Sequence, residues 1–110
     1  MTLKNNYKNI ITKTISKVAL ITLNRPESLN ALNKDLIADL NDALDSIENN
    51  ENISVIVITG SKKAFAAGAD IKEMENKTFI DLINNDFIKP WEQISYCSKP
   101  TIAAVEGYAL

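Results

Sequence analysis

The chain has 110 residues, of which 45% are hydrophobic and 24% charged, and its formal net charge is −2. This composition is ordinary for one small soluble globular domain. The small negative charge, without any run of Lys or Arg, argues against nucleic acid as a partner. The single cysteine, Cys97, excludes an intramolecular disulfide and favours a reducing compartment.

The apolar stretches of the chain are short. All fall well below the roughly 18 apolar residues of a membrane-spanning helix. Residues 1–9 are polar and lack the apolar core of a secretory signal. We therefore expect no membrane contact and a cytoplasmic location. The chain has no histidine, so we expect no metal site and interpret Cys97 as a packing residue and not a catalytic thiol.

Two β-rich runs open the chain, at residues 7–14 and 18–23. Residues 15–17 separate them, and this arrangement predicts a hairpin. The second run has apolar residues at consecutive positions, so we expect it to be buried on both faces. Pro26 ends it, because proline cannot donate to a strand ladder.

An amphipathic helix follows, with Asn33 as its predicted N-cap and residues 49–50 as its end. Residues 53–59 then form a nearly continuous β-branched run, which is typical of an interior parallel strand. Strand, helix and strand in this order predict a right-handed βαβ crossover. The apolar helix positions recur at spacings of one, three and four: Leu36, Ile37, Leu40, Ala43, Leu44 and Ile47.

The second half of the chain predicts a short helical turn at residues 71–74 and a mainly helical segment at 78–96, with a kink before Pro90. Pro100 precedes a last strand at 101–105. The whole pattern predicts an α/β fold with loops at one edge of a sheet, where such folds bind ligands. Six apolar residues share one face of the helical segment: Phe79, Leu82, Ile83, Phe87, Trp91 and Ile94.

The loop from Ala66 to Lys72 is the first candidate site. Gly68 frees the backbone, the flanking alanines leave room for a flat ligand, and N–H groups at the following turn suit a developing negative charge. Composition alone favours close packing over ligand binding. A phosphate-binding P-loop is excluded, because the chain contains no GxxxxGK[ST] motif.

The polar loop after the second strand is another candidate. Arg25 is open to two interpretations, a phosphate contact or the more common structural role. Residues 30–32 either shape a nucleotide cleft or cap the helix. Among the acids, Asp70 is the predicted N-cap of the short turn, and Glu73 and Glu75 are expected to be solvated.

Four segments resemble the enoyl-CoA hydratase (crotonase) family: ALITLNRPESLNALN (19–33), ISVIVITG (53–60), KAFAAGADIKEM (63–74) and KPTIAAVEGYAL (99–110). The likeness is collinear from about Tyr7 onward, and the sequence of these segments is most similar to that of the short-chain hydratases. The resemblance implies a crotonase-like spiral of ββα units (the ClpP/crotonase fold), incomplete at the C-terminus. Residues 1–110 are then the N-terminal portion of a single domain.

The resemblance also implies an activity, the lyase reaction that hydrates 2-enoyl-CoA to 3-hydroxyacyl-CoA in fatty-acid β-oxidation. Coenzyme A thioester is the implied substrate and no cofactor is permanently bound, while full-length relatives form homotrimers or hexamers. The backbone N–H of Ala69 is implied to be half of an oxyanion hole, which reverses the packing interpretation of its loop. The implied acyl-CoA contacts are Ser28, Leu29, Ala31, Ala67, Ala69, Asp70, Ile71 and Lys72.

In the family, a second oxyanion N–H and two catalytic glutamates follow the segment that ends at Leu110, and Glu106 matches neither glutamate. We therefore expect this chain alone to be inactive and poorly stable, with its last strand an unpaired edge. Two alternatives remain: a non-catalytic acyl-CoA-binding remnant or half of a split protein, and another crotonase-type reaction such as isomerisation.

Overall fold

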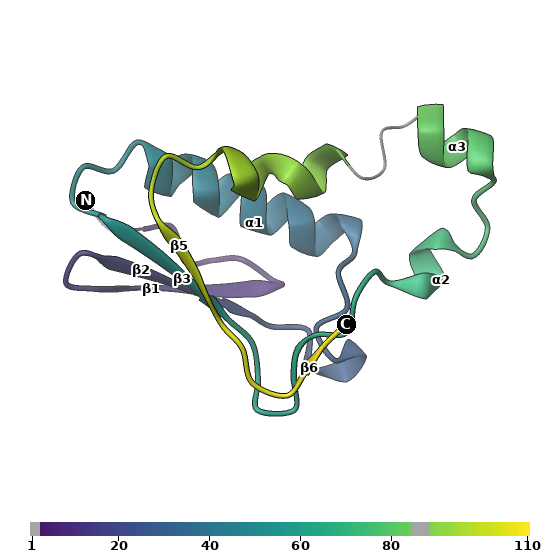
Figure 1. Cartoon of the computed structure of the whole chain (residues 1–110), viewed down its shortest axis with the longest axis horizontal. Coiled ribbons are helices and arrows are strands. Elements are labelled where there is room, and N and C mark those ends of the chain that lie inside the picture. The colour runs from purple at the N-terminus through teal and green to yellow at the C-terminus, as the bar shows by residue number, and fades with distance from the viewer. Residues whose placement is uncertain (1–2, 85–88) are drawn as a thin grey trace.

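The computed structural model describes residues 3–84 and 89–110. A four-stranded sheet has the order β1-β2-β3-β5, and a two-stranded sheet is formed by β4 and β6. The long helix Lys34–Glu48 and the 3₁₀ helix Lys89–Tyr96 lie on one side of the larger sheet, whereas the two short helices between them in the chain's second half, Ile71–Met74 and Phe79–Asn84, extend away from it (Figure 1). The elements in chain order are β1 (Ile10–Ile15), β2 (Val18–Leu23), the 3₁₀ turn η1 (Pro26–Ser28), α1 (Lys34–Glu48), β3 (Val55–Thr59), β4 (Ala64–Ala66), α2 (Ile71–Met74), α3 (Phe79–Asn84), the 3₁₀ helix η2 (Lys89–Tyr96), β5 (Thr101–Ala104) and β6 (Tyr108–Ala109).

The predicted hairpin is confirmed. β1 and β2 are antiparallel, and Ile15 pairs with Val18 across a turn in which Ser16 has a positive φ of 53°. β1 begins at Ile10 and not at Tyr7, because the chain before it packs against α1. There the hydroxyl of Tyr7 donates a 2.7 Å hydrogen bond to Asp42 of the helix.

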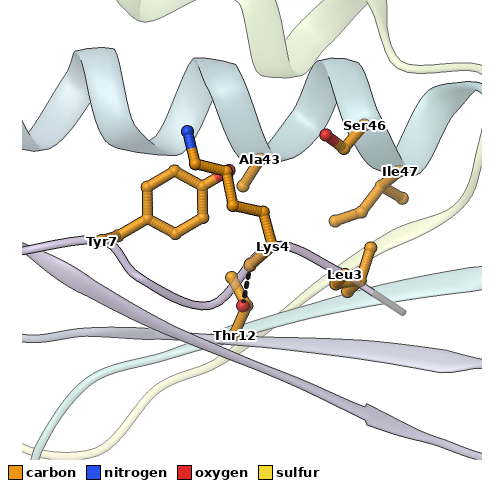
Figure 2. A pocket seen from close by; sticks show the side chains of 7 residues that line it. All are labelled: Leu3, Lys4, Tyr7, Thr12, Ala43, Ser46 and Ile47. Carbon is orange, nitrogen blue, oxygen red and sulfur yellow. Dashed lines mark hydrogen bonds between the residues drawn. The ribbon is translucent and has the colours of Figure 1, made fainter. Parts of the chain in front are cut away.

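The N-terminal segment lies between α1 and the sheet edge, as Figure 2 shows. Leu3, Lys4 and Tyr7 line a small hollow there with Ala43 and Ile47 of α1. The hydroxyl of Thr12 in β1 donates a 2.6 Å hydrogen bond to the carbonyl oxygen of Lys4. These contacts satisfy the buried hydroxyl and attach the segment to the fold.

The βαβ connection is also confirmed. α1 joins β2 to β3, and these two strands are parallel, from Val18 with Val55 to Thr22 with Thr59. β3 pairs on its other side with β5, so it is an interior strand as predicted. The core lies between α1 and the sheet: Ile10, Ala19, Ile21, Leu23, Leu36, Ile37, Ala43, Leu44, Ile47, Ile53, Ile56, Ile58 and Ala66.

β2 is not buried on both faces, and that expectation is wrong for the described residues. Ala19, Ile21 and Leu23 are buried under α1, whereas Val18 and Leu20 on the opposite face are only half-buried. The reason is that α1 and η2, the helices that cover the sheet, both lie on the same side of it (Figure 1). The consecutive apolar residues of β2 do not indicate that one face of the strand is more buried than the other.

Both predicted ends of α1 are confirmed. The side chain of Asn33 accepts a 2.9 Å hydrogen bond from the N–H of Leu36, and Asn49 is the C-cap. The ammonium of Lys99 donates to the carbonyl oxygens of Ile47 and Asn50 at 2.6 and 2.5 Å. A positive charge at this end complements the helix dipole.

The segment 78–96 is not one helix. It contains α3 and η2, and the predicted kink before Pro90 adjoins residues 85–88. These four residues, which include Phe87, lie outside the described residues, as does the side chain of Leu82. Trp91 and Ile94 of η2 pack against the core. Phe79 and Ile83 of α3 are exposed, so the predicted apolar face does not pack as one surface.

Cys97 follows η2 and packs against the core, as predicted. Burial, and then the negative charges of Glu48 and Asp45, raise the pKa of the Cys97 thiol above its usual value. A thiol held in its neutral form is a poor nucleophile. Its packing role is therefore supported.

The last strand of the larger sheet, β5, ends at Ala104 and not at Val105. All four of its residues are exposed. The parallel pair of β4 and β6 was not predicted, because strands of three and two residues have too little periodicity to be recognised. Within the described ranges, no helix is long and apolar enough to cross a lipid bilayer.

Candidate functional site

Loop 67–70 leaves β4 and runs beside residues 29–32, which we call strip 29–32. The N–H of Ala67 donates a 3.1 Å hydrogen bond to the carbonyl oxygen of Leu29. The structure thus brings together the two segments that the sequence marked as candidate sites, although residues 33–66 separate them in the chain.

Leu32 holds two successive peptides of the loop. Its N–H donates to the carbonyl oxygen of Gly68 at 2.7 Å, and its carbonyl oxygen accepts from the N–H of Asp70 at 2.9 Å. The Gly68 carbonyl and the Ala69 N–H belong to the same trans peptide, so they point in opposite directions. The N–H of Ala69 therefore points away from strip 29–32.

The Ala69 N–H makes no hydrogen bond among residues 3–84 and 89–110. Ala69 as a residue is half-buried, and its N–H is unpaired within the described chain. In the described part of the chain the N–H of Gly68 is also unpaired, but there the Ala67–Gly68 peptide makes no hydrogen bond that would orient it. An N–H that is oriented and has no partner among the described residues is suited to a carbonyl oxygen that gains negative charge.

The end of the chain borders the loop on its other side. The N–H of Leu110 donates to the carbonyl oxygen of Ala66 at 3.0 Å. Gly68 has a φ of +96°, and a Cβ at that position would lie 3.4 Å from the carbonyl oxygen of Leu110. Glycine is required here for its backbone conformation more than for space.

Arg25 and Asp70 form an ion pair across the two segments. Their closest N–O distance is 3.2 Å, and the side chains are only 13% and 15% exposed. The Arg25 guanidinium also donates to the carbonyl oxygen of Ala31 at 2.5 Å and to the hydroxyl of Ser28 at 3.4 Å. These contacts support the structural interpretation of Arg25 and not the phosphate contact.

Asn30 is a residue whose importance the sequence did not reveal. It is 1% exposed with a φ of +57°. Its side-chain oxygen accepts from the N–H of Arg25 at 2.7 Å, and its amide donates to the carbonyl oxygen of Ala64 at 3.1 Å. Asn30 thus neither caps α1 nor faces a cleft. The available signal was its type, because asparagine tolerates positive φ and bonds to nearby backbone.

The acids around α2 have structural partners. Asp70 is the N-cap, as predicted, and accepts from the N–H of Lys72 at 3.0 Å. Glu73 is not merely solvated: its two carboxylate oxygens accept from the N–H of Lys34 at 3.0 and 2.8 Å. The first N–H groups of α1 lack partners in the helix and attract a carboxylate. Glu75 is exposed, as expected.

Most predicted contact residues lie together. Ser28, Leu29, Ala31, Ala67, Ala69 and Asp70 are half-buried in adjacent segments. Ile71 and Lys72 are exposed on the first turn of α2. Among the described residues, no three His, Cys, Asp or Glu side chains are grouped to hold a metal ion.

Residues 13–110 match the family model described as enoyl-CoA hydratase/isomerase. The chain belongs to the enoyl-CoA hydratase/isomerase (crotonase) family. It is 50% identical over 107 residues to a probable mitochondrial enoyl-CoA hydratase of Dictyostelium discoideum, covering 94% of this chain and 39% of that protein. It is 43% identical over 101 residues to 2,3-dehydroadipyl-CoA hydratase of Escherichia coli, covering 92% and 40%.

Solved structures agree on the fold. An enoyl-CoA hydratase structure from Geobacillus kaustophilus matches with a TM-score of 0.85 at 38% identity, over 92% of this chain and 39% of that one. The α/β crotonase fold is therefore confirmed for the part that is present. The chain spans about two fifths of the length of the relatives it matches.

Proposed function

We propose that this chain carries the thioester-binding part of an enoyl-CoA hydratase site, which hydrates 2-enoyl-CoA to 3-hydroxyacyl-CoA in fatty-acid β-oxidation. The observation that carries the proposal is the N–H of Ala69, which has no partner among the described residues and whose direction is set by the bond between Leu32 and the Gly68 carbonyl. In this proposal the N–H donates to the thioester carbonyl oxygen.

The chemistry needs such a donor. Addition of water at C3 of the enoyl group places negative charge on the thioester oxygen before a proton reaches C2. A backbone N–H oriented in advance stabilises this charge, and loss of one such donor typically lowers kcat by about 100- to 1,000-fold. The small side chains of Ala67 and Ala69 leave room for a flat acyl group. In this proposal Ser28, Leu29 and Ala31, on the other side of the loop, contact the CoA portion of the substrate.

The acids beside Ala69 do not supply the acid–base chemistry. Asp70 is paired with Arg25, and Glu73 holds the first N–H of α1. We propose that glutamates outside these 110 residues activate the water and deliver the proton, so that this chain alone is inactive. The engagement of Asp70 and Glu73 in structural contacts also favours a second candidate, a non-catalytic acyl-CoA-binding remnant or one half of a split protein.

The test compares two ligands that differ in one atom group. ¹⁵N-labelled protein is titrated with crotonyl-CoA and with its thioether analogue, S-(2-butenyl)-CoA, which lacks the carbonyl oxygen. We expect the Ala69 amide proton to shift downfield with the thioester only. The Ala67 amide, already bonded to Leu29, is the internal control. Equal shifts of the Ala69 amide with both ligands would refute the carbonyl contact.

The intact mass of the protein expressed from its native locus separates the two candidates. A mass near 12.2 kDa, with thioester binding and no hydration of crotonyl-CoA, favours the remnant or split protein. A mass more than twice as large, with hydration, favours the complete hydratase. The cytoplasmic location and the homotrimer or hexamer remain predictions, to be checked by fractionation and light scattering; the Dictyostelium relative is described as mitochondrial.

A further inference from the structure

Asp70 directly follows Ala69, and its two carboxylate oxygens have separate partners. Oδ1 accepts from the N–H of Lys72 at 3.0 Å, and Oδ2 lies 3.2 Å from Nη1 of Arg25. One carboxylate therefore connects loop 67–70 both to the first turn of α2 and to Arg25.

The Arg25 guanidinium reaches the opposite side of the same junction. Its Nη1 donates to the carbonyl oxygen of Ala31 at 2.5 Å. Leu32 and Ala69 form a parallel bridge. Ala31 directly precedes Leu32 in the chain, and Asp70 directly follows Ala69. The Arg25 guanidinium therefore joins Ala31 and Asp70, the chain neighbours of the two bridged residues.

This placement bears on the orientation of the Ala69 N–H. The direction of that N–H depends on the bond from Leu32 to the carbonyl oxygen of Gly68. The Arg25–Asp70 pair restrains sliding of strip 29–32 along the loop, which would break this bond. Because the pair is largely buried, salt screens it less than an exposed ion pair.

We propose that Arg25 and Asp70 are a positioning pair, which keeps the Ala69 N–H aligned with the thioester carbonyl as charge develops. The inference rests on the proposed function. Neither residue contacts the reacting atoms in it; both act through the bridge between Leu32 and Ala69.

The test is Asp70→Asn in the native-length protein. Asparagine remains a good N-cap, so the start of α2 is preserved while the charge is removed. We expect kcat for crotonyl-CoA to fall roughly 10- to 100-fold, the size of effect that a misplacement of about 1 Å produces. KM should change by less than about threefold, because the donor acts mainly where charge develops.

Asp42→Asn is the matched control. It also removes a carboxylate from an ion pair, with Lys4 at 3.4 Å, but these side chains are 54% and 52% exposed and belong to the N-terminal segment and α1. We expect its kcat and KM to be unchanged. Arg25→Lys keeps the positive charge but loses the planar fork, so an intermediate kcat is expected.

The Ala69 amide shift distinguishes the two possible failures. If the wild-type amide responds equally to the thioester and the thioether, the proposed function fails. If it responds to the thioester alone, and Asp70→Asn and Arg25→Lys show the same shift and kcat as wild type, the positioning role is refuted. Should circular dichroism show Asp70→Asn to be unfolded, Arg25→Lys decides by the same two readouts.

Discussion

The helix–sheet core is held together by different interactions from those that join residues 25–34 to residues 64–73, two segments that we call the crossing loops. α1 packs on the sheet through aliphatic side chains such as Ile21, Leu36 and Ile56, each 0% exposed. Residues 25–34 and 64–73 are joined instead by backbone hydrogen bonds and a few polar side chains. Hydrophobic burial is not directional, whereas hydrogen bonds are. The core therefore needs suitable volumes, and the loops need particular atoms.

This difference explains how one loop can present a free N–H. A loop packed by large apolar side chains would have no room for a ligand beside its backbone. Loop 67–70 is built from small residues, and polar contacts on one side of it supply the rigidity that packing supplies elsewhere. Substitutions in the core should accordingly lower stability through lost hydrophobic burial, and substitutions in the crossing loops through lost hydrogen bonds.

The largest loss of stability is expected from the core. Ile56→Ala removes a fully buried side chain and leaves a cavity under α1. The free energy of unfolding should fall by about 3–4 kcal/mol. Urea denaturation measures it, with Ile15→Ala, at a side chain 50% exposed, as the control. Equal losses for the two variants would contradict the one-sided core.

A smaller loss is expected from Asn30→Ala in the crossing loops. The change removes the partners of the Arg25 N–H and the Ala64 carbonyl and puts alanine at a positive φ. Unsatisfied buried backbone groups predict a loss of about 2–3 kcal/mol in the free energy of unfolding. The control is Asn41→Ala, whose hydrogen bond to Pro90 is exposed. A variant at position 30 as stable as the control would show that the loops do not depend on these bonds.

The N-cap of α1 lies between the two regions and should have an intermediate to small effect. Asn33→Ala removes the acceptor of the Leu36 N–H. The expected loss in unfolding free energy is about 1 kcal/mol, while Asn33→Asp, which can still cap, should change it by a few tenths. Thermal unfolding followed by circular dichroism compares them. Identical behaviour of both variants would argue against the cap.

The smallest effect concerns pH. The hydrogen bond from the Tyr7 hydroxyl, followed by that from Lys4, lowers the pKa of Asp42 below its ordinary value. The folded pKa is thus below the unfolded value of about 3.9. The stabilisation that the Asp42 carboxylate provides is complete at pH values above its unfolded pKa, and it disappears as the pH falls through its folded pKa. Urea denaturation between about pH 2 and 6 should show a weaker acid dependence in Asp42→Asn than in wild type, and an unchanged dependence would refute this.

Much of the fold could be predicted because local patterns determine it. The hairpin, both ends of α1, the interior strand β3 and the turn at 71–74 all have signals within a few residues of one another. The resemblance identified the family on the same local segments. Predictions failed where partners are distant: the two-faced burial of β2 and the solvated state of Glu73 depend on which helix lies nearby.

By itself the sequence determined the main elements of the larger sheet, the long helix between them and the family, since periodicity, caps and sequence motifs are local properties. Only the tertiary structure decided what the loop atoms do. It placed strip 29–32 beside loop 67–70, paired Arg25 with Asp70, and left the Ala69 N–H without a partner among the described residues. Whether a hydrogen bond forms depends on differences of a few tenths of an ångström in the distance between atoms of remote segments. The spacing of residues along the sequence does not reveal these distances.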